Sequence, residues 1–298
     1  MNTDNQSPKV GLVTVLYNGK EVLEGFFESL ASQTYQNYKL YVIDNSPDDE
    51  TLDLAIQLAD KYNVPAEFVN NNANLGVAKG NNQGIELSLF SGCEYVLLLN
   101  NDIDFKENVI EEILRNAVER DASIVVPKIY YAGTNKIWQA GGGISRLTGI
   151  GYHVGEGHED KGQFDVIRHY ENSSTCFALI HESVFDKVGF MDEDYFVYYD
   201  DTDFFYRCFK RNIKICYIPT ITINHRVSFS SGGADSPFSL RYGTRNLVIF
   251  FRKNMPLYSF AWYSFLLLSR IITVSLLKRR GLSISLKAFR EGLIFKCR

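Results

Sequence analysis

A group of amide and carboxylate side chains within residues 100–104 is the first feature that could do chemistry. These side chains are Asn100, Asn101, Asp102 and Asp104, and they follow the unbroken apolar run of residues 95–99. Such a run is typical of a strand buried on both faces of a parallel sheet, and ligands bind at the carboxyl edge of that sheet. Crowded carboxylates there favour a divalent cation, Mg²⁺ or Mn²⁺. A polar loop that only ends the strand is the alternative.

A second group of carboxylates lies among the aromatic side chains of residues 195–207. It consists of Asp200, Asp201 and Asp203. Burial and like charge raise the pKa of at least one carboxylate in such a group, which suits a general base. The alternative is structural, because Asp201 or Thr202 could cap a helix over residues 204–210 and Asp203 could interact with the helix dipole.

The elements that must position these groups follow from hydrophobic periodicity. Strands are predicted at residues 10–17, 38–43, 66–69 and 95–99, and helices at residues 21–30, 49–62 and 74–89. Strands that alternate with helices form right-handed βαβ units, so the sequence predicts an α/β fold with a doubly wound, mostly parallel sheet. No dinucleotide-binding or phosphate-loop motif follows the first strand. A bound diphosphate would therefore need a cation, which is a second reason to expect Asp102 to be a metal ligand.

The second half of the chain carries further predicted elements. Strands are expected at residues 121–130 and 214–218, and helices at residues 182–188 and 239–252, with an apolar run at residues 174–180 before the first of these helices. Residues 138–157 are rich in glycine and predict hairpins or a mobile flap over the site. His153 and His158 lie in this stretch, where solvated loop histidines are the simpler interpretation.

Length and composition limit the class of protein. The 298 residues are 45% hydrophobic and 22% charged, which is enough for one large or two small globular domains. The five cysteines are odd in number and show no CxxC spacing, so neither a disulfide framework nor a zinc site is expected. Residues 1–9 are polar and predicted to be disordered, with no apolar signal peptide before the first strand, so a reducing cytoplasm is the expected compartment.

Charge is divided unevenly along the chain. From Arg241 onward there are 12 basic residues and one acidic residue, a balance of +11, whereas the preceding chain carries −15. Two apolar stretches, residues 257–277 and 282–295, lie in this basic end. They predict interfacial helices on an anionic membrane, with two helices packed in the protein core as the alternative. Nucleic acid is not expected, because no binding motif accompanies the charge.

Several motifs appear in the order of a known family. They include residues 16–18, 42–46, 74–85, 97–102, 188–192 and 199–203, followed by Arg245-Asn246. Together these residues resemble a family 2 glycosyltransferase of the GT-A fold, in the rhamnosyltransferase-like branch. The resemblance covers residues 10 to about 250.

The resemblance assigns roles on the donor side. It implies that Tyr17 packs on the nucleotide base and that Asp44 hydrogen-bonds the base or ribose. Further residues are implied to line the nucleotide pocket: Asn74, Gly76, Lys79, Asn82 and Asn100. Arg245 could meet a phosphate in a bidentate manner, although a surface salt bridge would also explain it.

The resemblance also implies a metal shell and a base. Asn100-Asn101-Asp102 occupies the place of the family's Asp-x-Asp motif, so Asp102 is the primary ligand of Mg²⁺ or Mn²⁺. The late His225 could complete the shell. Asp104 lies outside the motif and is either a further ligand or a loop carboxylate. Asp201 falls where the family has its catalytic base, and Asp200 stands where it usually has Glu.

These inferences predict residues 10–254 as a GT-A catalytic domain, with a nucleotide-binding half at 10–104 and an acceptor-binding half at 105–254. Residues 255–298 are predicted to form basic amphipathic helices. The expected activity is inverting transfer of rhamnose or a hexose from a dTDP- or UDP-linked donor to a lipid-linked glycan, in cell-surface polysaccharide assembly at the inner membrane face. The alternatives are an inactive nucleotide-sugar-binding protein and a nucleotidyltransferase, although residues 16–20 lack the Gly/Arg/Lys-rich loop of the latter.

Overall fold

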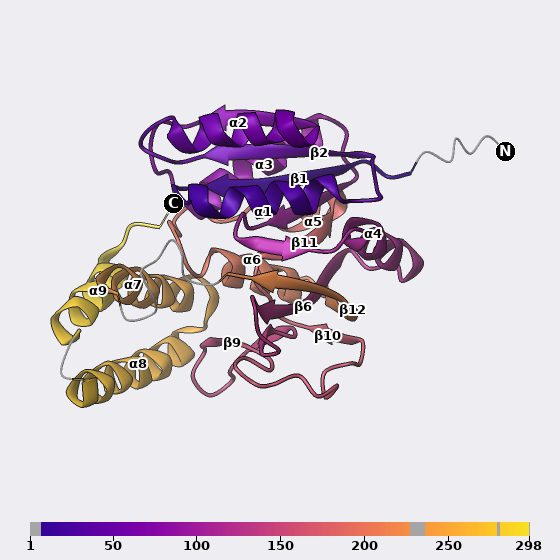
Figure 1. The fold of residues 1–298 in the computed structure, drawn as a ribbon. Helices are drawn as coiled ribbons and strands as arrows, with labels where there is room; N and C mark the ends of the chain where they lie inside the picture. Colours follow the sequence, from indigo (N-terminus) through magenta and orange to yellow (C-terminus); the bar gives the residue numbers. More distant parts are fainter. Residues whose placement is uncertain (1–6, 227–235, 279–280, 298) are drawn as a thin grey trace.

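The computed structural model describes residues 7–226, 236–278 and 281–297. Figure 1 shows a central sheet with helices on both faces and a group of three helices, α7, α8 and α9, beside it. Residues 1–6 of the predicted disordered N-terminus lie outside the described residues. Lys9 is held by a hydrogen bond from its Nζ to the carbonyl oxygen of Ser91, 2.8 Å away.

The N-terminal half alternates strands and helices as predicted. Its elements are β1 (Val10–Leu16), α1 (Lys20–Ala31), β2 (Tyr38–Asp44), α2 (Glu50–Tyr62), β3 (Ala66–Asn70), α3 (Val77–Phe90) and β4 (Tyr95–Leu99). Strands β3, β2, β1 and β4 are neighbours in that order, and all three pairings are parallel. Their carboxyl ends therefore meet at one edge of the sheet.

The second half extends the same sheet. Its elements are β5 (Ile103–Phe105), α4 (Val109–Glu119), β6 (Ile124–Tyr131), β7 (Ile137–Gln139), β8 (Gly142–Ile144), β9 (Gly151–His153), β10 (Arg168–Tyr170), β11 (Phe177–His181), α5 (Glu182–Val188), α6 (Asp200–Lys210) and β12 (Ile215–His225). The strand order is β10-β12-β6-β11-β4-β1-β2-β3. Strand β11 is antiparallel to β4 and β6, which gives the mixed, mostly parallel sheet. The Gly-rich stretch forms the short strands β7, β8 and β9.

Helix α6 begins earlier than the sequence pattern predicted. Tyr198 and Tyr199 adopt left-handed backbone conformations, with φ of 64° and 67°, and turn the chain into the helix at Asp200. The expectation that Asp201 or Thr202 caps a helix starting at Phe204 is therefore wrong. All three carboxylates of the second group lie in the first turn of α6.

The C-terminal chain forms α7 (Pro237–Asn254), α8 (Leu257–Lys278) and α9 (Leu282–Ile294). Helix α9 lies against α7 (Figure 1), and its Gly292 is so close that an added Cβ would be 2.7 Å from the carbonyl oxygen of Arg245. Arg252 of α7 donates to the carbonyl oxygens of Gly292 and Phe295. Helix α9 therefore packs on the protein, which is the alternative to the membrane-surface role expected for it.

Helix α8 differs from α9 because most of its surface is uncovered. Leu267 and Ile271 are buried against the neighbouring helices, whereas large apolar side chains at helical spacing are exposed: Tyr258, Trp262, Phe265, Ile272 and Leu276. Among the described residues, this is the helix whose length and composition would allow a membrane span. The window Leu257–Val274 has a mean hydropathy of 1.4, and 11% of it is buried.

Candidate active site

The first cavity lies at the carboxyl edge of the parallel strands and has a volume of about 520 Å³. Five of the predicted site residues line it: Tyr17, Asn74, Gly76, Asn100 and Asp102. Gly76 has a φ of 88°, and a Cβ there would lie 2.5 Å from the carbonyl oxygen of Phe196. A glycine at this position allows the start of α3 to meet the segment before α6, and Val77 N–H donates to that same oxygen at 2.7 Å.

Asp102 and His225 face each other at the boundary of this cavity. Strand β5 pairs with the end of β12, with Ile103 opposite His225, and the Arg226 N–H donates to the Asp102 carbonyl oxygen at 2.8 Å. This pairing places His225 Nε2 3.1 Å from Asp102 Oδ1. The Trp138 ring and the imidazole pack in a T-shaped arrangement, with 4.4 Å between ring centroids.

Asp102 and His225 could bind a divalent cation whose remaining ligands come from outside the protein. Asp102 Oδ1 is buried and lies 3.1 Å from His225 Nε2, which places a carboxylate oxygen and an imidazole nitrogen side by side. The described residues contain no group of three or more His, Cys, Asp and Glu side chains that could hold a metal. A cation bound here would draw its remaining ligands from a diphosphate and water, as Mg²⁺ commonly does.

Electrostatics at His225 reflect the same pairing. Burial by itself lowers the pKa of His225, but the Cys176 sulfur and the Asp102 carboxylate outweigh it and raise the pKa to about 10. Asn100 Nδ2 lies 3.5 Å from His225 Nε2. A cation that binds Nε2 must therefore compete with a proton.

Asp104 does not face this pair. Its carboxylate accepts two hydrogen bonds of 3.0 Å from the Arg226 guanidinium. Asp104 is therefore a strand residue of β5 in an ion pair with Arg226, which is neither the loop carboxylate nor the metal ligand that the sequence suggested.

Four other predicted donor-side residues do not line the first cavity. Asp44 is fully buried, and its Oδ1 accepts from the backbone N–H and the hydroxyl of Ser46. Burial raises the pKa of Asp44, and the Ser46 hydrogen bonds oppose this. Asn82 exchanges two hydrogen bonds of 2.9 Å with the backbone of Met191. Lys79 lies on α3 and is not among the lining residues.

Arg245 is the fourth of these residues, and its contacts are within the protein. Its Nη2 donates to the Asp194 carbonyl oxygen at 2.8 Å, and its guanidinium lies over the rings of Tyr242 and Phe295. Burial lowers the pKa of Arg245. These contacts hold the segment before α6, and the phosphate contact stays a prediction.

The second cavity has a volume of about 510 Å³ and contains the second carboxylate group. Asp200 and Asp201 both line it, together with His225 and Trp138. The two cavities share four wall residues: Val77, Asn100, Thr175 and Val197. The two cavities are therefore neighbours, with Asp102 on the wall of one and His225 on the wall of the other.

Asp200 and Asp201 differ in their surroundings. Burial raises the pKa of Asp200, and the neighbouring Asp201 charge raises it further. Burial also raises the pKa of Asp201, but its Oδ1 accepts from the backbone N–H of Thr202 at 2.6 Å and from the Thr202 hydroxyl at 3.2 Å, which lowers it. Asp201 is thus the better stabilised carboxylate of the two.

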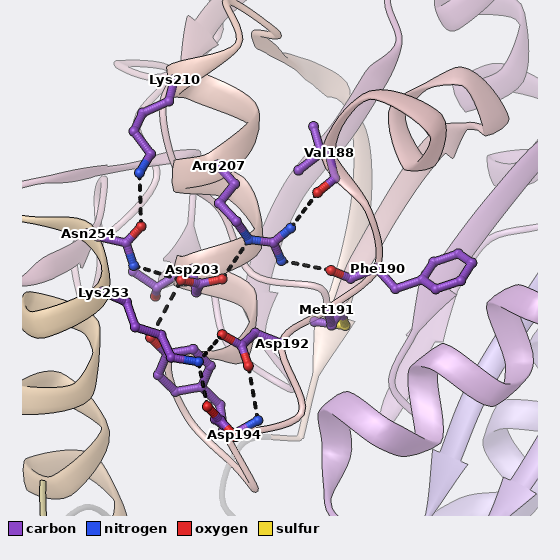
Figure 2. Close-up of polar contacts among 12 residues, drawn as sticks. Val188, Phe190, Met191, Asp192, Asp194, Asp203, Arg207, Lys210, Lys253 and Asn254 are labelled. Carbon is purple, nitrogen blue, oxygen red and sulfur yellow. Dashed lines mark hydrogen bonds and ion pairs between the residues drawn. The ribbon is translucent and has the colours of Figure 1, made fainter. Parts of the chain in front are cut away.

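A polar framework holds the turn that carries these carboxylates (Figure 2). Asp203 accepts from Arg207 Nε and from Asn254 Nδ2, each at 2.7 Å. Lys253 lies between the carboxylates of Asp192 and Asp194, 2.5 Å from each. The Asp203 carboxylate is therefore used in hydrogen bonds that hold the fold, whereas Asp200 and Asp201 line the cavity.

Asn246 has a structural role that the sequence did not reveal. It is fully buried on α7, and its Nδ2 donates to the carbonyl oxygens of Val197 and Tyr198 at 2.8 and 3.0 Å. These contacts fix the left-handed turn before Asp200. In the sequence, the Arg245-Asn246 motif was the only indication of a role for Asn246. The fold shows that its side-chain amide is the group that hydrogen-bonds the turn.

The sheet order, the two neighbouring cavities and Asp102 after β4 are those of the GT-A class of nucleotide-diphospho-sugar transferase folds. The family model described as "Glycosyl transferase family 2" matches residues 12–189, more than half of the chain. The chain therefore belongs to glycosyl transferase family 2 and is a glycosyltransferase, as the sequence motifs predicted.

Curated relatives extend this similarity. The chain is 23% identical over 242 residues to the low-salt glycan biosynthesis hexosyltransferase Agl10 of Haloferax volcanii, covering 80% of this chain and 73% of the relative. It is 26% identical over 257 residues to the dTDP-rhamnosyl transferase RfbF of Shigella flexneri, covering 81% and 79%.

Solved structures agree on the fold. A crystal structure of GalNAc-T7 with UDP, GalNAc and Mn²⁺ aligns with a TM-score of 0.67 at 14% identity, over 97% of this chain and 56% of that one. Staphylococcus aureus TarS aligns with a TM-score of 0.55 at 13% identity, over 85% and 41%. The chain thus spans about half the length of these structures. The GT-A fold predicted from the sequence is confirmed.

Proposed function

We propose that this protein is an inverting glycosyltransferase that moves rhamnose or a hexose from a nucleotide-diphospho-sugar to a lipid-linked glycan. The observation that carries the proposal is the pair of cavities with a common wall. Asp102 and His225 lie at their boundary, and Asp201 lies in the second. In this proposal residues 10–104 supply most of the donor side, and residues 105–254 supply the acceptor side.

The first cavity would hold the donor. Tyr17 is partly exposed at its rim, where a nucleotide base could stack. Asp102 and His225 would hold Mg²⁺ or Mn²⁺, which would neutralise the diphosphate as it leaves. A dTDP- or UDP-linked sugar fits the proposal, because one relative is named a dTDP-rhamnosyl transferase and one fold neighbour was crystallised with UDP.

Transfer would occur where the cavities meet. Asp201 accepts the proton of the acceptor hydroxyl, and the hydroxyl oxygen forms a bond to the anomeric carbon of the donor sugar. The bond from that carbon to the diphosphate oxygen breaks, and the nucleoside diphosphate leaves with the electron pair. A single displacement of this kind inverts the anomeric configuration. Asp200, whose pKa is raised further, stays next to the base and lines the same cavity.

The C-terminal end would bring the enzyme to its acceptor. The basic balance of +11 after residue 240 and the exposed apolar side chains of α8 support peripheral binding to an anionic membrane. We place the protein at the inner face of a bacterial cell membrane, in cell-surface polysaccharide assembly.

The test uses the purified full-length chain with a panel of dTDP- and UDP-linked sugars, with Mn²⁺, Mg²⁺ or chelator. We expect one donor to be hydrolysed slowly and to be transferred to a membrane lipid extract, with inverted configuration in the product by NMR. Binding of donors without any hydrolysis or transfer would instead support an inactive sugar-nucleotide-binding protein.

A further inference from the structure

The tip of the β8–β9 hairpin, residues 145–150, is fastened to helix α8. Trp262 Nε1 donates to the Leu147 carbonyl oxygen at 3.2 Å, and the Tyr263 hydroxyl donates to the Arg146 carbonyl oxygen at 3.0 Å. Figure 1 shows β9 beside one end of α8. The hairpin tip and the first half of α8 therefore form one surface of the protein.

The backbone of the hairpin tip is closed by its own hydrogen bonds. The Gly149 N–H donates to the Ser145 carbonyl oxygen at 2.7 Å, and the Ser145 N–H donates to the Ile150 carbonyl oxygen at 2.9 Å. Gly149 has a φ of 68°, and an added Cβ there would lie 2.7 Å from the Phe251 ring and 3.0 Å from the Tyr263 ring. A glycine is needed for this turn and this close approach, so the tip has a fixed position against α7 and α8.

The hairpin tip adds an exposed apolar side chain to those of α8. Leu147 is 66% exposed, although its backbone is bound to the helix. On α8, Tyr258, Trp262 and Phe265 are also exposed, and the rings of Trp262 and Phe265 lie 6.2 Å apart. Exposed apolar side chains that gather on one surface indicate an interaction site rather than a surface that faces only water.

Charge and side-chain type favour an anionic lipid surface as the partner. Residues 257–278 contain no Asp or Glu and carry Arg270 and Lys278, and the chain after residue 240 has a balance of +11. Arg146 of the hairpin tip is paired with Glu171 at 2.7 Å, so the tip brings no net charge of its own. Tyr and Trp, with an apolar ring and a polar end, are enriched at membrane interfaces, and basic residues are attracted to anionic head groups.

The same hairpin also forms part of the wall of the second cavity. Strand β9 follows the tip directly, and its residues Gly151, Tyr152 and His153 line that cavity. Leu147 lies four residues before Gly151, so the chain between them spans at most about 14 Å. A short segment of fixed geometry therefore joins the apolar surface to the proposed acceptor cavity.

We infer that the tip of the β8–β9 hairpin and helix α8 form one docking surface for an anionic membrane. Docking through this surface holds the second cavity at the bilayer and restricts the acceptor to sugars close to their lipid anchor. This inference rests on the proposed function, in which only the C-terminal end contacts the membrane. It adds a membrane contact from the catalytic domain itself and relates that contact to the choice of acceptor.

The first experiment places a fluorescent probe on the hairpin tip. Cys297 is the exposed cysteine and the other four are buried, so in a full-length Cys297→Ser protein an introduced surface thiol takes the label. Leu147→Cys carrying an environment-sensitive nitrobenzoxadiazole group should brighten at least twofold and shift to the blue with phosphatidylglycerol vesicles, but not with phosphatidylcholine vesicles. Val118→Cys, 56% exposed on α4 and away from α8 in Figure 1, is the matched control and should not respond. A silent Leu147 probe on protein that co-sediments with the vesicles would overturn the inference.

Two variants connect docking to transfer. Leu147→Glu should lower both vesicle binding and transfer to a membrane lipid extract in phosphatidylglycerol vesicles at least fivefold, because a charge opposes insertion, and should leave donor hydrolysis in Mn²⁺ unchanged. The double change Trp262→Phe with Tyr263→Phe keeps both rings but removes both hydrogen bonds to the tip. It should retain vesicle binding within about twofold while transfer falls several-fold. Val118→Glu should change none of these quantities, and wild-type transfer by both test variants would contradict the inference.

The same samples separate the two proposals. If the wild type neither binds nucleoside diphosphates nor hydrolyses any donor, the proposed function is at fault, and the Leu147 probe still decides whether the tip docks. If donors are hydrolysed and the protein binds vesicles without a probe response, only the inference fails. A dimer in analytical ultracentrifugation whose Leu147 probe is shielded before vesicles are added would mean that a second copy covers this surface, which also overturns the inference. Thermal unfolding of each variant shows that the fold is retained.

Discussion

Asp104 and Arg226 form a two-point ion pair that fastens the end of β12 to β5. Arg226 Nε and Nη2 each lie 3.0 Å from one oxygen of the Asp104 carboxylate. The residue before Arg226 is His225, which faces Asp102. The ion pair thus acts on the metal-binding side chains through the backbone, and Asp104 is a positioning residue.

Replacement of Asp104 by Ala should weaken Mn²⁺ binding in the presence of nucleoside diphosphate by about tenfold, since supporting groups around metal ligands typically contribute 10–100-fold. Isothermal titration with Mn²⁺ measures this. Glu67→Ala, which removes the Lys39–Glu67 pair far from the cavities, is the matched control and should leave Mn²⁺ binding unchanged. If both variants behave alike, Asp104 has no special role.

Asp102→Asn should remove the metal-dependent part of donor binding. Its buried Oδ1 lies 3.1 Å from His225 Nε2, so a cation would bind the carboxylate in place of a proton on the imidazole. We expect nucleoside diphosphate affinity in Mn²⁺ to fall at least tenfold, and affinity in chelator to be the same as for the wild type. Asp60→Asn, on the exposed surface of α2, serves as the control. Equal affinities for wild type and Asp102→Asn in Mn²⁺ would exclude the metal role.

Asp201→Asn should lower the transfer rate by about 10²–10⁴-fold, the usual contribution of a general base, and leave donor affinity within a few-fold. Steady-state kinetics and donor titration on the same samples test both parts. Retention of a near wild-type rate would mean that another group takes the proton, with Asp200 the next to replace.

The pH profile should report the same base. Burial raises the pKa of Asp201, so the carboxylate is charged only above a pKa higher than the ordinary aspartate value. Because the base must be unprotonated, kcat/KM should fall as the pH drops through that raised pKa. A profile that stays flat down to the ordinary carboxyl range would contradict this assignment.

Asn246→Ala should destabilise the protein by about 1–3 kcal/mol, because it leaves the carbonyl oxygens of Val197 and Tyr198 without their buried donor. Urea unfolding measures the free energy. Transfer should also fall, since the left-handed turn before Asp200 is no longer fixed. Gly243→Ala on the same helix, where an added Cβ meets no atom within 4 Å, is the control and should not destabilise the protein, since alanine favours a helix by about 0.5–1 kcal/mol over glycine.

The double change Phe265→Glu with Leu276→Glu should release the protein from phosphatidylglycerol vesicles. These side chains are 60% and 67% exposed on α8, and their apolar area is what would enter the membrane interface. Co-sedimentation at low and high salt measures binding, and salt alone should weaken it without abolishing it. Phe90→Glu, an exposed phenylalanine at the end of α3, is the control. A wild-type chain that remains in the supernatant at low salt would refute membrane binding.

The sequence by itself determined the alternating strands and helices, the edge where ligands gather, and the family. A strand formed by a continuous apolar run such as residues 95–99 is stable only when both of its faces are buried. The polar residues after each run mark the carboxyl ends of the strands. Asp102, Asp201 and Tyr17 could be proposed as site residues from the sequence, because each is identified by its position next to a predicted strand or helix. The order of the family motifs along the chain then predicted the class of reaction, glycosyl transfer.

Tertiary structure alone decided which side chains face the cavities. Arg245 and Asn82 have the chemistry of ligand-binding groups, yet long-range contacts with Asp194 and Met191 occupy them. Two tyrosines in left-handed conformations moved the start of α6 to Asp200, against local propensity, because Asn246 holds their turn from a distant helix. Hydrogen bonds between residues 48 to 109 positions apart leave no periodic signal in the sequence, and these bonds fix the geometry of the site.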